Sequence, residues 1–152
     1  MIFAGIGSTP YRIMLLLHVL AVIVAFGAPF VQPSLYRLSA REGAGGSVAG
    51  AQAAATTRVM LPALLVAGVL GFGLAGMSDD VYELSQGWLV AAVVLWLGQA
   101  ALYVFGIVPA LRQVGAGEEV PVKRVSILTG VLHLSLVVML WLMIWKPGGP
   151  GS

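Results

Sequence analysis

The sequence predicts an all-α membrane protein, an antiparallel four-helix transmembrane bundle, and three observations lead to this fold class. Of 152 residues, 59% are hydrophobic and only 9% are charged, whereas about 25% are charged in an average soluble domain. The mean hydropathy is +0.98. Four apolar stretches each approach the roughly 20 residues that a helix needs to cross a bilayer. Because lipid offers no partners for backbone polar groups, we expect the spans to be helical.

The expected spans cover residues 11–35, 59–77, 88–111 and 125–145 of one integral membrane domain, 1–152. The first span is too long for a secretory signal peptide, and only Arg12 precedes most of its apolar run. The connection after it is rich in Gly, Ala and Ser. Residues 48–57 carry enough alanine to extend the second span, with Ser47 as the N-cap; a disordered linker is the alternative.

Four prolines near the span ends are expected to kink or terminate helices: Pro29, Pro33, Pro62 and Pro109.

The distribution of charged residues predicts the orientation of the bundle in the membrane. Six basic residues flank the first and third connections: Arg37, Arg41, Arg58, Arg112, Lys123 and Arg124. The middle connection carries Asp79, Asp80 and Glu83 instead. The positive-inside rule therefore predicts extracytoplasmic termini, with Tyr82, Trp88, Trp141 and Trp145 at the outer interface.

The composition excludes several classes of function. Without cysteine the chain has no disulfide, thiolate metal site or cysteine nucleophile. Its few charges predict no nucleic-acid surface. It also lacks a Gly-Lys-Ser/Thr phosphate loop and an intramembrane carboxylate. The expected partners are the lipid bilayer and a larger membrane complex or further copies of the chain.

Polar residues within the spans are the candidates for function. His18 and His133, the two histidines, lie in the first and fourth spans, which are neighbours in an up-down bundle. Stripes of small and polar residues are expected to face the interior. They are Tyr11, Met14, His18, Ala21, Ala25, Ala28 and Gln32 in the first span, Ala92, Trp96, Gln99, Tyr103 and Gly106 in the third, and Ser126, Gly130, His133 and Val137 in the fourth.

The second span contributes small residues: Gly68, Gly71, Gly73, Ala75 and Gly76. Close helix packing is the simpler interpretation of these residues, and room for a flat ligand is the alternative. The flat molecule that we expect here is haem b, and His18 and His133 would bind its iron from the two sides. Gln99, expected near the level of His133, and Tyr103 would then hydrogen-bond around the site, and Trp96 would pack against it.

Other interpretations of the histidines stay open. Both imidazoles could simply join helices through hydrogen bonds. Met14, one turn from His18, adds a soft donor that suits copper. Proton transfer and quinone contact are further alternatives.

The stretch Leu-Leu-Leu-His-Val-Leu-Ala-Val at 15–22, continuing through Ala25-Phe26-Gly27 to the basic exit Leu35-Tyr36-Arg37, resembles a bacterial membrane family, domain of unknown function 2269. That family is similar to the CopD-type and HemJ-type membrane domains. The resemblance implies a four-helix membrane bundle and, from the HemJ type, haem b with an essential first-helix histidine, which corresponds to His18. The HemJ type also uses a third-helix lysine, which this chain lacks, so its enzymatic activity is not implied.

The sequence thus predicts a small b-type haem protein of the bacterial cytoplasmic membrane that transfers electrons with a membrane partner. The alternative is a non-catalytic accessory or structural subunit of a larger respiratory or transport complex. A stand-alone enzyme is not expected.

Overall fold

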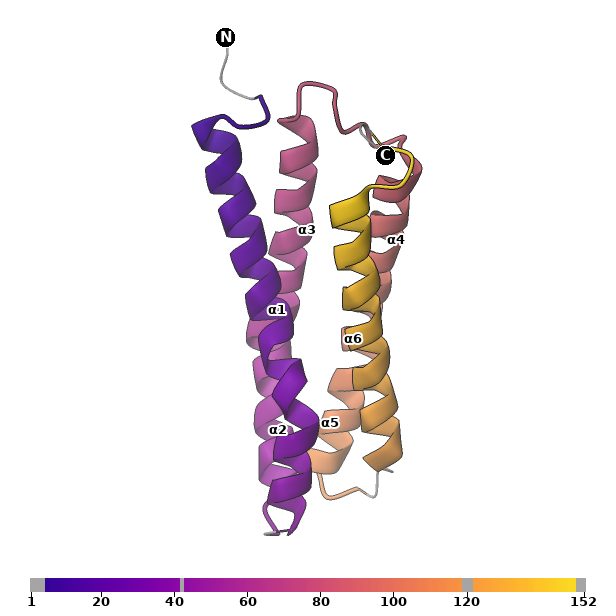
Figure 1. Ribbon diagram of the computed structural model, residues 1–152. Helices are drawn as coiled ribbons and strands as arrows, with labels where there is room; N and C mark the ends of the chain where they lie inside the picture. The colour runs from indigo at the N-terminus through magenta and orange to yellow at the C-terminus, as the bar shows by residue number, and fades with distance from the viewer. Residues whose placement is uncertain (1–4, 42, 119–121, 150–152) are drawn as a thin grey trace.

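The computed structural model describes residues 5–41, 43–118 and 122–149, and in these ranges the chain is helical, with turns and bends between helices and no strand. Four helices are long and apolar enough to cross a membrane: Thr9–Ser39, Gly45–Gly76, Gly87–Gly115 and Lys123–Trp145. They lie side by side along one long axis (Figure 1). The expected all-helical fold with four apolar helices is confirmed.

The spans are built from eight helical elements. The first is α1 (Thr9–Arg41); the second joins α2 (Gly45–Ala55), η1 (Thr56–Met60) and α3 (Leu61–Gly76); the third joins α4 (Gly87–Ala101), η2 (Leu102–Ile107) and α5 (Val108–Gly115); the fourth is α6 (Val122–Trp145). The spans extend further than expected at the basic end. The alanine-rich segment is helical, so the linker alternative is wrong.

Glycines end two of the helices at the basic end. Gly43 (φ +75°) and Gly117 (φ +81°) adopt the left-handed conformation that stops a helix. The Ala44 N–H donates to the Ser39 carbonyl at 2.8 Å, and the Glu118 N–H donates to the Gln113 carbonyl at 3.0 Å. Because the glycine that stops α1 is residue 43, the helix continues past the expected end at residue 35 and ends at Arg41.

The sequence predicts Ser47 as the N-cap of α2, and this prediction is wrong. Ala44 occupies that position, and the Ser47 hydroxyl donates back to the Ala44 carbonyl at 2.9 Å. The helix begins earlier because the preceding glycine already turns the chain.

The prolines do not terminate the spans. Pro29 and Pro33 lie inside α1, whereas Pro62 and Pro109 lie in the first turns of α3 and α5, directly after the π-helical segments η1 and η2. A proline ring clashes with the carbonyl four residues earlier, and the wider π turn is one way to relieve such crowding. Of the two expected effects, kinking or terminating a helix, termination is therefore wrong for all four prolines.

The interior faces are as expected on two spans and differ on one. Every residue of the α1 stripe is buried or half-buried, and so is every residue of the stripe on α4 and η2. On α6, however, Gly130 and Val137 are exposed, and the buried residues are Val125, Thr129, Leu132, Leu136 and Leu142. Small or polar character does not identify the inner face of α6, because lipid accepts apolar side chains as readily as a protein interior does.

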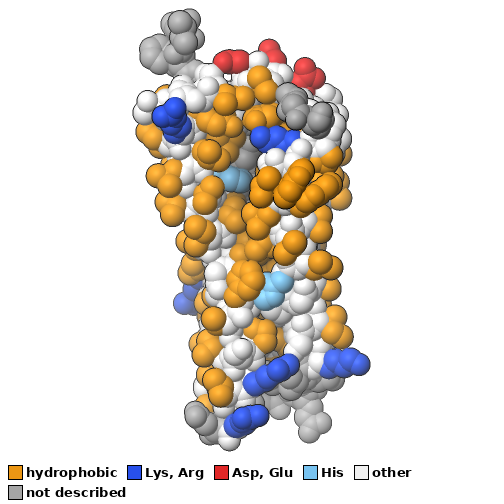
Figure 2. All heavy atoms as spheres, viewed as in Figure 1, with side chains coloured by type: hydrophobic (Ala, Val, Ile, Leu, Met, Phe, Trp, Pro, Cys, Tyr) orange, Lys and Arg blue, Asp and Glu red, His pale blue; other side chains and the backbone are white. Residues whose placement is uncertain are grey.

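Charge divides the two ends of the bundle. Figure 2 shows acidic side chains gathered at one end and most basic side chains towards the other. At the acidic end the Lys146 ammonium donates to the Tyr82 hydroxyl at 2.8 Å, and the Tyr82 ring packs edge-on against Trp88, with centroids 5.7 Å apart. Tyr82 and Trp88 therefore pack together at the acidic end of the bundle.

Candidate functional site

His18 joins α1 to α3. Its Nδ1 lies 2.8 Å from the Ala67 carbonyl oxygen, and since a carbonyl can only accept, Nδ1 carries the proton. The Nε2 atom then keeps its lone pair and has no hydrogen-bond partner among the described residues. A Cβ atom on Gly71 would lie 3.4 Å from the His18 Cε1 atom, so this glycine lets the half-buried ring lie close to the helix.

Met14 and Trp96 fill the space beside two other glycines of α3. A Cβ atom on Gly73 would lie 2.6 Å from the Met14 sulfur, and one on Gly68 would overlap the Trp96 indole. The Trp96 Nε1–H donates to the Leu64 carbonyl at 2.8 Å. The space beside these glycines is therefore occupied by side chains, which supports the packing interpretation.

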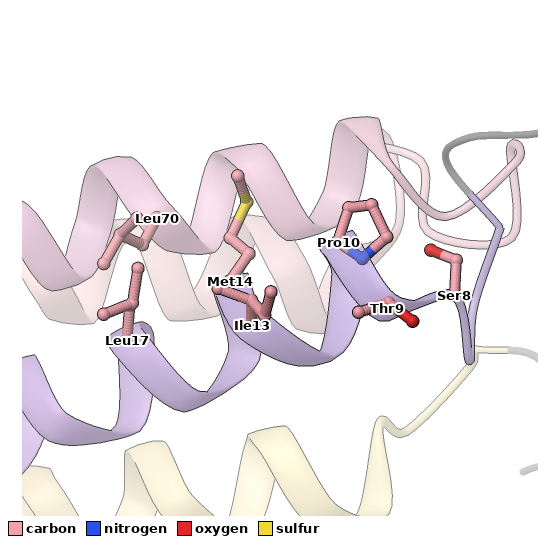
Figure 3. A pocket seen from close by; sticks show the side chains of 7 residues that line it. All are labelled: Ser8, Thr9, Pro10, Ile13, Met14, Leu17 and Leu70. Atoms are coloured by element: carbon pink, nitrogen blue, oxygen red, sulfur yellow. The ribbon is translucent and has the colours of Figure 1, made fainter.

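Met14 also lines a groove between α1 and α3 near the acidic end (Figure 3). The groove has a volume of about 670 Å³ and a mainly apolar lining that includes Ile13, Leu17 and Leu70, whereas His18 is not part of it. Within the described ranges, no group of three or more His, Asp or Glu side chains is placed to hold a metal ion.

Tyr103 compensates for a proline. Pro29 has no N–H, so the Ala25 carbonyl of α1 lacks its helical donor. The hydroxyl of Tyr103, on η2, donates to this carbonyl at 2.7 Å, and the tyrosine is fully buried. Tyr103 thus closes a gap in the backbone hydrogen bonds of α1.

His133 lies beside the next gap in the same helix. The residue four positions after Pro29 is again a proline, so the Pro29 carbonyl also lacks a helical donor. The His133 imidazole interacts with the Pro29 backbone and stacks on the Phe30 ring, with centroids 4.2 Å apart and an interplanar angle of 10°. Its Nε2 atom is buried without a hydrogen-bond partner.

Gln99 joins α4 to α6. Its Nε2 donates to the Ser135 hydroxyl at 3.1 Å, and that hydroxyl donates to the Leu132 carbonyl at 2.7 Å. The expectation that Gln99 orients His133 is therefore corrected. His133 and Ser135 lie two residues apart in α6, yet His133 contacts α1 and Ser135 contacts α4. Which helix each side chain contacts depends on the rotation of α6 about its axis.

The structure does not bring His18 and His133 together. His133 stacks on Phe30, which follows His18 by twelve residues in α1, or about 18 Å along the axis. Two axial ligands of one metal ion each form bonds of about 2 Å, on opposite sides of it. A single haem between the two histidines does not fit this arrangement. Figure 2 likewise shows the two histidines at different distances from the acidic end.

Phe30 and the two proline-freed carbonyls were not among the candidates from the sequence. The available signal was the pair Pro29 and Pro33, because each proline frees a carbonyl four residues earlier. Comparison with known proteins finds no matching family model, no matching curated protein and no matching solved structure. The chemistry of the site must therefore be inferred from its own geometry.

Proposed function

We propose that this chain is a small membrane protein that binds haem b through His18 and exchanges electrons with a membrane partner. The observation that carries the proposal is the hydrogen bond from His18 Nδ1 to the Ala67 carbonyl. A histidine that binds a metal through one nitrogen usually donates the other ring N–H to a carbonyl or carboxylate. His18 is already held in that tautomer.

The free nitrogen of His18 adds support. With Nδ1 bonded to the Ala67 carbonyl, the Nε2 lone pair of this half-buried ring stays available to a metal ion. The resemblance of 15–37 to a family related to haem-binding domains points to the same histidine, and kinship to that family is part of the proposal.

In this proposal His18 would hold the iron, the Ala67 carbonyl would orient the imidazole, and the Trp96 bond to Leu64 would fix the adjoining turn of α3. A bound haem supplies one-electron chemistry. His133 is not a ligand of the same iron.

We further propose an antiparallel bundle in the bacterial cytoplasmic membrane, with both termini outside the cytoplasm. Figure 1 shows the start of α1 and the end of α6 at the same end of the molecule as the connection between α3 and α4, which carries Asp79, Asp80 and Glu83. The opposite, basic end would then face the cytoplasm, in accord with the positive-inside rule.

The test is an absorption spectrum of the purified protein in detergent, before and after dithionite, with haem supplied during expression. We expect a reduced α-band typical of haem b. His18→Ala should abolish it, whereas His133→Ala is the matched control and should retain it. Absence of the band in the wild type, or its retention in His18→Ala, would contradict His18 ligation, and loss of the band in His133→Ala would contradict the exclusion of His133 as a ligand.

A non-catalytic accessory subunit is the second candidate. Trp96, Gln99 and Tyr103 each donate a hydrogen bond to a neighbouring helix, as expected of side chains whose role is to join helices. If added haem neither produces a spectrum nor changes the thermal unfolding of the wild type, this candidate is the better account.

A further inference from the structure

Arg58 and Arg112 face one cleft between α2 and α5, at the basic end of the bundle. The cleft has a volume of about 290 Å³, and besides the two arginines it is lined by Thr57 and by glycine and alanine residues. Both arginine side chains are exposed. The cleft is separate from the environment of His18.

The small residues bring the two helices into backbone contact. A Cβ atom on Gly115 would lie 3.1 Å from the Gly50 Cα atom. With no larger side chain between them, space remains beside this contact, and the two guanidinium groups border it. The packing of α2 on α5 therefore creates the hollow.

Neither arginine forms an ion pair within the part of the chain that the structure describes. Asp79, Asp80 and Glu83 lie in the connection at the opposite end, and Glu118, which follows α5, is exposed and pairs with neither arginine. The Thr57 hydroxyl donates to the Ala53 carbonyl at 2.9 Å, which leaves the guanidinium groups as the cleft's side-chain donors. The site thus combines two unpaired cations with room for an anion.

The length of the second span would place the cleft near the level of the lipid phosphates. Arg58 precedes the end of α3 by eighteen residues, or about 27 Å along the axis, close to the roughly 30 Å thickness of the hydrocarbon core. Guanidinium binds phosphate through paired, charge-assisted hydrogen bonds. Basic pockets between transmembrane helices are known to hold anionic head groups.

We infer that the cleft between α2 and α5 binds a phosphate group through Arg58 and Arg112. The phosphate could belong to an anionic phospholipid or be free in solution, and the two sources can be separated. The measurement is thermal unfolding in dodecyl maltoside with added phosphatidylglycerol, with phosphatidylcholine, or with inorganic phosphate against chloride at equal ionic strength.

We expect one of two results for the wild type. If phosphatidylglycerol raises the unfolding temperature more than phosphatidylcholine does, the bound phosphate belongs to a lipid. If only inorganic phosphate raises it, the bound phosphate is the free ion. Arg58→Gln and Arg112→Gln should each weaken the apparent affinity about tenfold or more, the effect of losing a charge-assisted hydrogen bond. Arg37→Gln removes the same charge at the same end, outside the cleft, and should leave the affinity unchanged.

Arg58→Lys and Arg112→Lys control for misfolding of the glutamine variants. Lysine keeps the positive charge but cannot form the two parallel hydrogen bonds that a guanidinium group forms with phosphate. The lysine variants should unfold at the wild-type temperature without ligand and still bind more weakly. The inference is overturned if neither probe stabilises the wild type, if Arg37→Gln weakens binding as much as the cleft variants, or if the lysine variants bind as tightly as the wild type.

Discussion

At the residue scale, Pro29 and Pro33 explain why two polar side chains from other helices lie against the middle of α1. Each proline frees one backbone carbonyl, and an unpaired carbonyl in an apolar interior costs about 1 to 3 kcal/mol. Tyr103 donates to one of them, and His133 approaches the other. These polar contacts are the consequence of keeping proline inside a membrane helix.

Tyr103→Phe should destabilise the protein by about 1 to 2 kcal/mol, because it leaves the Ala25 carbonyl without a donor while keeping the ring. Reversible unfolding in mixed detergent micelles measures the change. The control is the double variant with Pro29→Ala, since alanine restores the N–H that donates to Ala25 within the helix. In that background the cost of Tyr103→Phe should shrink. An unchanged cost would show that the hydroxyl does not compensate for the proline.

At the scale of the element, α3 is the helix on which two neighbours meet. It accepts hydrogen bonds from His18 of α1 at Ala67 and from Trp96 of α4 at Leu64. Glycines at the same level let both large rings approach the backbone. Packing of rings onto a surface of small residues, reinforced by hydrogen bonds, is a usual way to associate helices in lipid.

Gly68→Ala should destabilise the bundle by about 1 to 3 kcal/mol, the usual cost of overpacking, because its Cβ atom would overlap the Trp96 indole. Gly98→Ala is the matched control. Gly98 lies exposed in α4 with no neighbour within 4 Å of an added Cβ atom, so alanine there should be neutral or stabilising by up to about 1 kcal/mol. Thermal unfolding of both variants in one detergent checks this; equal effects would refute close packing at Gly68.

At the scale of the whole molecule, the first three spans are much longer than the hydrocarbon core requires. Thr9–Ser39 has 31 residues, Gly45–Gly76 has 32 and Gly87–Gly115 has 29, whereas about 20 residues cross the core. The excess must extend beyond the hydrocarbon. Because α2 and α5 lie at the basic end (Figure 1), they are the segments placed to reach into the head groups there.

The orientation of the bundle can be tested by cysteine labelling, since the chain has no cysteine of its own. Ser85→Cys, in the acidic connection, should react with an impermeant thiol reagent in intact cells. Ala116→Cys, at the basic end, should react only after the membrane is opened. Both positions are exposed, and Ala116 has φ −82°, whereas a cysteine at the adjacent Gly117 (φ +81°) would be strained. The reverse pattern would place the acidic end in the cytoplasm.

The amino-acid sequence by itself determined the class of this protein, its four apolar helices and the charge difference between its ends. These properties depend on composition and on segment length, which are local. The inner faces of α1 and α4 also followed from the spacing of small and polar residues, which recur at intervals of three and four within each helix: Met14, His18, Ala21 and Ala25 in α1, and Ala92, Trp96 and Gln99 in α4.

Only the tertiary structure decided which side chains meet. The axial offset of about 18 Å between His18 and the neighbour of His133 depends on the register of α6 against α1, and the pairing of Gln99 with Ser135 depends on the rotation of α6 about its axis. Neither quantity leaves a periodic signal in a helix that is apolar all round, because lipid accepts every apolar face and so does not select one for the interior.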